Sequence, residues 1–122
     1  EFAHADETLR QGLENTLASH GVSVRIGAVW TTDAVFRETR AKVEQFQAAD
    51  MLAVEMETSA LFAVAAFRQV RLASLLVVSD ELGSLTWKPG FKDPGFKTAR
   101  ETAAKAVMEF SRQRLQALAH TP

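Results

Sequence analysis

The chain has 122 residues, and 47% of them are hydrophobic, so it can form one compact domain with an apolar core. Its formal net charge is −1 with acids and bases interspersed, which gives no electrostatic basis for binding nucleic acid or an anionic membrane. It contains no cysteine, which excludes disulfides, thiolate nucleophiles and cysteine metal sites.

The first half of the chain predicts a helix, a strand and a second helix. Residues 6–19 carry leucines near helical spacing, with Asp6 placed to cap the helix and Gly21 placed to stop it. Residues 22–30 alternate apolar and polar positions and include β-branched side chains, which predicts a strand. Residues 38–47 then predict a short surface helix.

The second half predicts a strand, a helix and a strand, followed by a loop and a long helix. Residues 51–56 and 72–78 are short apolar runs on either side of an alanine-rich helical pattern at 57–70. Almost continuous apolar runs suit strands that are covered on both faces, so we expect an α/β fold with a mostly parallel sheet flanked by helices. Residues 83–95 contain three glycines and predict a loop, and residues 98–118 predict a helix.

Polar residues lie at the ends of the three predicted strands. They are Asp33, Glu55, Glu57, Ser79 and Asp80. In a parallel sheet, ligands bind outside the carboxyl ends of the strands, where the loops are free and helix N-termini point. We therefore expect these side chains to converge on one crevice.

Three segments carry polar residues at predicted strand ends: VEME at 54–57, a strand that ends in Ser79-Asp80, and TTDAVF at 31–36. Together they resemble the nucleoside phosphorylases of the purine and uridine type, as well as related nucleosidases. Each segment alone is a weak signal, but their order, spacing and setting agree with the family. The resemblance covers only the C-terminal half of that family, and no glycine-rich phosphate cradle is visible here.

The resemblance implies a fold, a reaction and partners. It implies that residues 1–122 form one α/β domain, the C-terminal part of a three-layer phosphorylase-like fold without its N-terminal half. It also implies cleavage of a nucleoside N-glycosidic bond with inorganic phosphate as co-substrate, no cofactor or metal, and a homo-oligomer, either a dimer or a hexamer. We expect a cytoplasmic protein without a membrane partner, since neither a signal peptide nor a membrane span is visible. The net charge of −1 likewise predicts no nucleic-acid partner.

The resemblance also implies roles for individual residues. Glu57 would accept hydrogen bonds from the ribose hydroxyls, Met56 would pack on the sugar, and Glu55 would assist beside them. Asp80, following Ser79, would be the catalytic acid that protonates purine N7.

The aromatic pair that flanks the base in the family corresponds to Val35 and Phe36, so only Phe36 could stack. Uridine-cleaving members generally lack the acid and have a glutamine and an arginine where Thr39 and Ala41 stand here, so purine is favoured. Trp87, in the predicted loop, either covers the base or packs on its own domain.

Alternatives stay open. Glu55 and Glu57 could be acids that favour a helix N-terminus, and Ser79 and Asp80 could form a turn or cap. The reaction could be hydrolytic, with water in place of phosphate. The chain could also be a catalytically silent module that associates through its apolar faces. Its three histidines are scattered and suggest no metal site.

Overall fold

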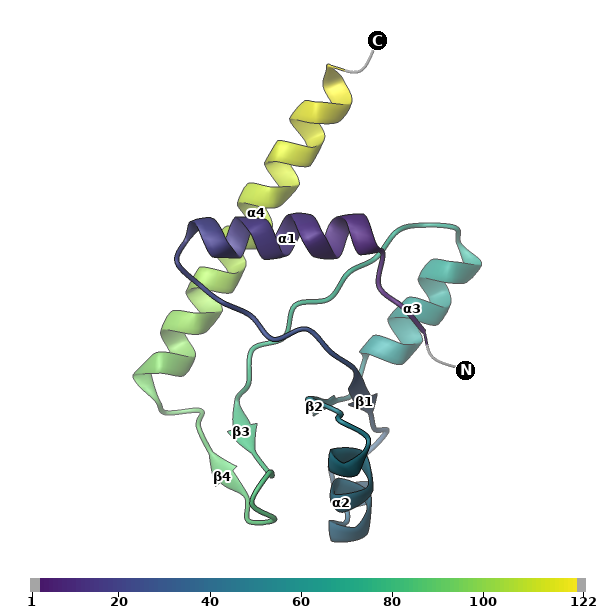
Figure 1. The fold of residues 1–122 in the computed structure, drawn as a ribbon, viewed down its shortest axis with the longest axis vertical. Helices are drawn as coiled ribbons and strands as arrows, with labels where there is room; N and C mark the ends of the chain where they lie inside the picture. The colour runs from purple at the N-terminus through teal and green to yellow at the C-terminus, as the bar shows by residue number, and fades with distance from the viewer. Residues whose placement is uncertain (1–2, 121–122) are drawn as a thin grey trace.

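The computed structural model describes residues 3–120 and has an α/β fold (Figure 1). This part of the chain contains four α-helices, one short 3₁₀ helix and two sheets of two strands each. The predicted α/β class is confirmed in this form. No helix within residues 3–120 is both long and apolar enough to cross a membrane.

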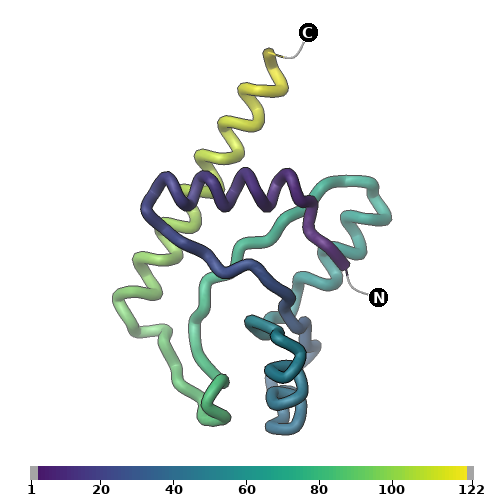
Figure 2. Tube along the Cα trace, in the orientation of Figure 1, coloured from purple at the N-terminus to yellow at the C-terminus, as the bar shows by residue number. Residues whose placement is uncertain are grey.

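The apolar core lies where the first and last helices cross. Helix α1 spans Glu7–Ser19 and begins at Asp6, whose carboxylate accepts a hydrogen bond from the N–H of Leu9 at 2.8 Å, as predicted. Helix α4 spans Pro94–Ala119. Leu13 and Leu17 of α1 pack there with Ala106 of α4. The traces in Figure 2 show α1 across α4, whose C-terminal part extends beyond the rest of the molecule.

Helix α4 starts before the predicted residue 98, inside the segment 83–95 that was predicted to be a loop. Asp93 caps it by accepting a hydrogen bond from the N–H of Gly95 at 2.7 Å, and Pro94 occupies the first turn. Proline is tolerated at this position because its missing N–H has no partner within the helix. The helical pattern of residues 98–118 is confirmed but is extended at its start by a local cap.

The predicted parallel pairing is confirmed for the first two strands. Strand β1 spans Val29–Thr31 and β2 spans Ala53–Glu55, in parallel register. The helices that follow these strands are α2, Arg40–Ala48, and α3, Thr58–Phe67. Both strands are shorter than the predicted segments, which were 22–30 and 51–56. The 3₁₀ helix η1, Val35–Arg37, lies between β1 and α2.

The prediction of a strand at residues 72–78 is wrong for this structure. The segment crosses the molecule between α3 and the following hairpin without forming a sheet, although Leu75 packs against the core cluster (Figure 1). Sheet structure requires a neighbouring backbone to complete the hydrogen-bond ladder, and among residues 3–120 this segment has none in register. The expected mostly parallel sheet is therefore only the β1–β2 pair.

An antiparallel hairpin follows this segment, inside and just before the predicted loop. Strand β3 spans Asp80–Glu81 and β4 spans Lys88–Pro89, with Asp80 opposite Pro89. The side-chain amide of Gln47 in α2 donates to the carbonyl oxygen of Gly83 at 2.9 Å, so the hairpin turn contacts α2. Glycine content indicated a turn correctly but did not reveal the strands on either side of it.

Many large apolar side chains remain exposed in this structure. Phe36 and Phe67 are more than 80% exposed, and α3 and the second half of α4 add further exposed side chains: Leu61, Val64, Val107, Met108, Leu115 and Leu118. Large exposed apolar surfaces are typical of sites that contact protein, membrane or ligand, or of aggregation-prone faces. The predicted apolar faces therefore exist, but residues 3–120 cover only part of them.

The α1–α4 crossing gives a test of where the core lies. We expect Leu17→Ala to lower the free energy of unfolding by about 2–5 kcal/mol, because Leu17 is 3% exposed and truncation leaves a cavity. Urea denaturation followed by circular dichroism measures the change. The matched control is Leu115→Ala in α4, whose side chain is 67% exposed and which should change stability by less than about 0.5 kcal/mol. Equal losses in the two variants would contradict this placement of the core.

Candidate active site

The parallel register of β1 and β2 brings Thr31 and Glu55 together. The two residues are paired at the carboxyl ends of their strands. The Thr31 hydroxyl donates a hydrogen bond to the Glu55 carboxylate, and it accepts one from the N–H of Ser59 at 3.1 Å. Residues from β1, β2 and the start of α3 are thereby joined at one sheet edge, where the sequence predicted a site.

Glu55 also caps helix α3. Its Oε2 atom accepts hydrogen bonds from the N–H groups of Glu57 at 2.7 Å and Thr58 at 2.6 Å. Partial burial raises the pKa of the Glu55 carboxyl, but hydrogen bonds from two threonine side chains and two backbone N–H groups outweigh it and lower the pKa below its ordinary value. The helix-start role that the sequence left open is thus filled by Glu55.

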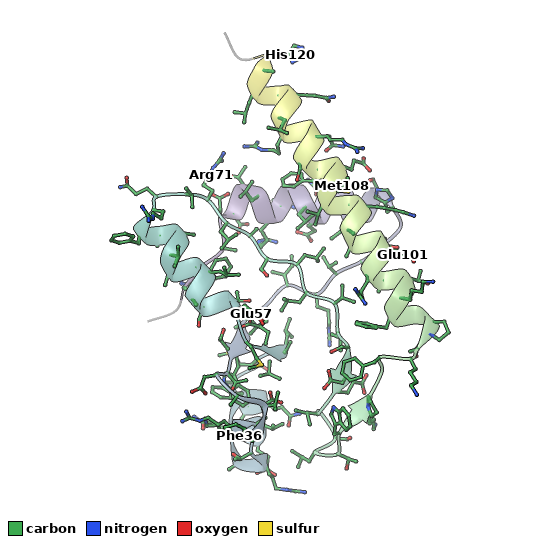
Figure 3. All side chains as sticks on the ribbon, turned by 180° about the vertical axis from the view of Figure 1, so that it is seen from behind. Phe36, Glu57, Arg71, Glu101, Met108 and His120 are labelled. Atoms are coloured by element: carbon green, nitrogen blue, oxygen red, sulfur yellow. The ribbon has the colours of Figure 1, made fainter. Side chains whose placement is uncertain are left out.

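Unlike Glu55, Glu57 and Met56 are exposed and do not cap α3 with their side chains. Glu57 directly precedes α3, but its side chain does not cap the helix; its carboxylate accepts a hydrogen bond at 3.2 Å from the N–H of Met56. Both side chains are exposed, Met56 by 44%. Figure 3 shows Glu57 at the junction between β2 and α3. An exposed carboxylate next to an exposed thioether can receive the hydroxyl edge and the apolar face of one small molecule.

Asp80 is held by two donors. The Ser79 hydroxyl donates to Oδ1 at 2.5 Å, and the indole N–H of Trp87 donates to Oδ2 at 2.8 Å. Asp80 lies in β3 and Trp87 lies directly before β4, so the hairpin brings them together. Ser79 and Asp80 were predicted as site residues, whereas a contact between Trp87 and Asp80 was not.

Glu38 is a further acid on which the charge of Asp80 acts, and the sequence predicted it only as the first residue of a surface helix. Its side chain is half-buried. Desolvation, and secondly the negative charge of Asp80, raise the pKa of Glu38 above its ordinary value. Glu38 stands two residues after TTDAVF, which was a possible signal, but the sequence alone did not show that the charge of Asp80 acts on it.

The segment 31–38 therefore links two groups of polar residues. The Glu55 cluster consists of Thr31, Glu55, Met56 and Glu57, and the Asp80 cluster consists of Glu38, Ser79, Asp80 and Trp87. Thr31 at one end of the segment contacts Glu55, and Glu38 at the other end is influenced by the charge of Asp80.

Other residues of this segment are exposed. Val35 and Phe36 lie on it in η1, and Figure 3 shows Phe36 in the lower part of the molecule. Asp33, which was expected to converge with the other acids, instead forms an exposed ion pair with Arg37 at 2.8 Å.

Within residues 3–120, no group of three or more histidine, aspartate or glutamate side chains is arranged to hold a metal ion. The polar groups of both clusters instead offer acceptors and donors suited to an organic ligand.

Comparison with known families decides the relationship. A family model described as the phosphorylase superfamily matches residues 1–119. The chain belongs to this superfamily. A stretch of 62 residues, 51% of the chain, is 44% identical to proteins named purine nucleoside phosphorylase DeoD-type from Bacillus cereus, Bacillus thuringiensis and Bacillus mycoides.

The match to these curated relatives is partial. It covers 26% of the length of each of them. No solved structure matches the chain significantly. The resemblance inferred from 54–57, 79–80 and 31–36 is confirmed at the level of the superfamily.

The capping role of Glu55 predicts a pH-dependent stability. We expect Glu55→Gln to lower the free energy of unfolding by about 1 kcal/mol at pH 7, because an amide replaces the carboxylate that accepts the N–H groups of α3. Since the folded-state pKa is lowered, this stabilisation is present above the unfolded value of 4.5 and is lost as the pH falls through the lower folded value. Urea titrations between pH 3 and pH 7 measure it, with Glu101→Gln, on exposed helix surface, as control. A difference that does not shrink with acid would contradict the cap.

Glu38 should behave in the opposite way. Its raised pKa means that the folded chain binds the proton more tightly than the unfolded chain, so the group favours folding at low pH and opposes it as the pH rises. We expect Glu38→Gln to stabilise the protein at pH 7 and to have no effect once Glu38 is protonated. The control is Glu44→Gln, since Glu44 is exposed and lies 3.7 Å from Arg40. Destabilisation by Glu38→Gln at pH 7 would rule out repulsion from Asp80.

Proposed function

We propose that this phosphorylase superfamily member cleaves the N-glycosidic bond of a purine nucleoside with inorganic phosphate. The observation that carries the proposal is the linkage of the two clusters through residues 31–38, which supports their convergence on one ligand. Cleavage of this bond develops positive charge on the ribose and negative charge on the departing base. A site for the reaction therefore needs an acceptor at the sugar and a proton donor at the base, and the two clusters offer one of each.

Glu57 is our candidate for the sugar side of the site. Its exposed carboxylate can accept hydrogen bonds from the 2′ and 3′ hydroxyls and adds negative potential near the forming oxocarbenium ion. Met56, exposed beside it, can pack on the ribose. The carboxylate of Glu55 already accepts hydrogen bonds from Thr31 and from α3, so we assign to it the role of holding the turn that presents Met56 and Glu57.

Asp80 is our candidate for the base side, as the acid that donates a proton to purine N7 as the bond breaks. Ser79 holds its carboxyl group through a hydrogen bond. The exposed side chains of Val35 and Phe36 are candidates for contact with the base, with Phe36 the stacking partner. Two features favour purine over uridine: the presence of an aspartate at this position, and the names of the relatives that share 44% identity.

The exposed apolar surface supports a larger assembly. We propose that the short sheet is part of a three-layer fold completed by protein outside these 122 residues, which also supplies the phosphate-binding groups. The unpaired apolar segment 72–78 and the exposed face of α3 support this proposal. We further propose that the protein acts as a cytoplasmic homo-oligomer and needs no cofactor beyond phosphate.

The decisive experiment assays the full-length protein with inosine, adenosine and uridine, with and without phosphate. We expect base release from the purine nucleosides only when phosphate is present. Asp80→Asn should lower kcat/KM for inosine by about 10²–10⁴-fold, the usual contribution of a general acid. Glu57→Gln should raise KM and lower kcat together, because the ribose interaction strengthens in the transition state.

Matched controls keep the result specific. Asp50→Asn makes the same substitution at an exposed aspartate with φ 55°, a conformation that asparagine adopts readily, and should leave the rate within about twofold. Base release without phosphate would replace phosphorolysis with hydrolysis. If Asp80→Asn leaves purine turnover within a factor of a few, Asp80 is not the acid.

A further inference from the structure

The hairpin holds Trp87 in a fixed relation to Asp80. Asp80 pairs with Pro89, and the N–H of Gly90 donates to the carbonyl oxygen of Ser79 at 2.8 Å. A Cβ atom on Gly90 would lie 2.8 Å from that same oxygen, closer than a real Cβ approaches, so only glycine allows the two strands to meet here. Trp87 stands directly before β4 and is carried to Asp80 by this pairing.

The contact between Trp87 and Asp80 is not explained by core packing. The Trp87 side chain is 56% exposed, and its ring lies 6.5 Å from that of Phe91, which is also exposed. A tryptophan that merely filled a core would be covered on both faces. Its indole N–H nevertheless makes a hydrogen bond of 2.8 Å to Asp80. The polar interaction of Trp87 is therefore this hydrogen bond, which orients the carboxylate of Asp80.

We propose that Trp87 is a positioning residue for Asp80, and that it determines which carboxyl oxygen carries the catalytic proton. The inference rests on the proposed function, in which Asp80 is the acid. An indole N–H can only donate, and in a protonated carboxyl group the carbonyl oxygen accepts a hydrogen bond better than the hydroxyl oxygen, so Trp87 favours Oδ2 as the carbonyl oxygen. The proton of the acid form is therefore assigned to Oδ1, beside Ser79, whose hydroxyl can accept as well as donate.

This assignment defines the transfer step. The proton on Oδ1 moves to N7 of the purine as the bond between N9 and C1′ breaks, and the electron pair of that bond goes to the base. Phosphate oxygen forms the new bond to C1′. Asp80 is left as a carboxylate whose Oδ2 is still held by Trp87, and it recovers a proton from solvent. Trp87 supplies no proton itself and acts only through the orientation of Asp80.

Trp87→Phe in the full-length protein tests the proposal, because it removes the N–H and keeps an aromatic ring. We expect kcat for inosine to fall about tenfold with KM within about twofold, since an interaction with the acid matters most in the transition state. The effect should disappear when Asp80→Asn is already present, so the two substitutions should be non-additive. Trp30→Phe is the matched control, because Trp30 packs on Phe46 at 4.4 Å and does not bond Asp80.

A second substrate separates positioning from a general loss of structure. In 7-methylinosine the base already carries the positive charge that protonation would create, so its release needs no acid. We expect Trp87→Phe and Asp80→Asn to turn over 7-methylinosine at close to the unsubstituted rate while both are slow with inosine. This rate also reports whether each variant is folded.

The outcomes distinguish the inference from the proposed function. If Asp80→Asn is slow with inosine but Trp87→Phe is not, or if their effects multiply, Trp87 does not act through Asp80 and only the inference is overturned. Equal losses of Trp87→Phe on both substrates would also overturn it, because the residue would then act on folding or binding. If Asp80→Asn itself keeps the inosine rate, the acid assignment fails, and the inference fails with it.

Discussion

The parallel pairing of Thr31 with Glu55 is the contact on which the candidate site depends. It joins the ends of β1 and β2, and the same carboxylate then accepts the first N–H groups of α3. Donors at a helix start have no partner within the helix, so a carboxylate at this point both stabilises α3 and fixes the turn before it. Met56 and Glu57 lie within that turn and are left exposed. One acid thus satisfies the backbone, and its neighbour is available to a ligand.

The Asp80 cluster is built on a different principle. Its acid lies on an antiparallel hairpin instead of a parallel strand end, and the hairpin closes because a glycine allows two backbones to approach. Trp87 and Ser79 then hold the two carboxyl oxygens separately. Glu38 adds a second negative charge from the segment after β1. Side chains from separate parts of the chain therefore set the orientation and the electrostatics of one aspartate.

The apolar surface has a common physical cause. Strands were expected at 22–30 from alternating apolar positions and at 72–78 from an apolar run, yet of these two segments only Val29–Thr31 contributes to a ladder. A strand is stable only when a neighbouring backbone satisfies its hydrogen bonds and another layer covers its faces. Within residues 3–120 those neighbours are few, so apolar residues of α3 and α4 remain exposed as well. Residues 3–120 therefore bury only part of the apolar surface that the sequence pattern predicts.

Features that depend on residues close together in the chain could be predicted from the sequence alone. Helix positions follow from periodicity and caps, as with Asp6 at the start of α1. The sequence also predicted parallel strands, but which of them pair, and in which register, is seen only in the structure. The superfamily followed from short motifs in a fixed order. The other features depend on contacts between distant residues, so only the tertiary structure shows them. They are the hairpin at Asp80, the hydrogen bond from Trp87, and the influence of Asp80 on Glu38. The structure also shows that Glu55 caps α3 while Glu57 stays exposed. Periodicity carries no information on which distant side chains meet, so these partners become visible only once the chain is folded.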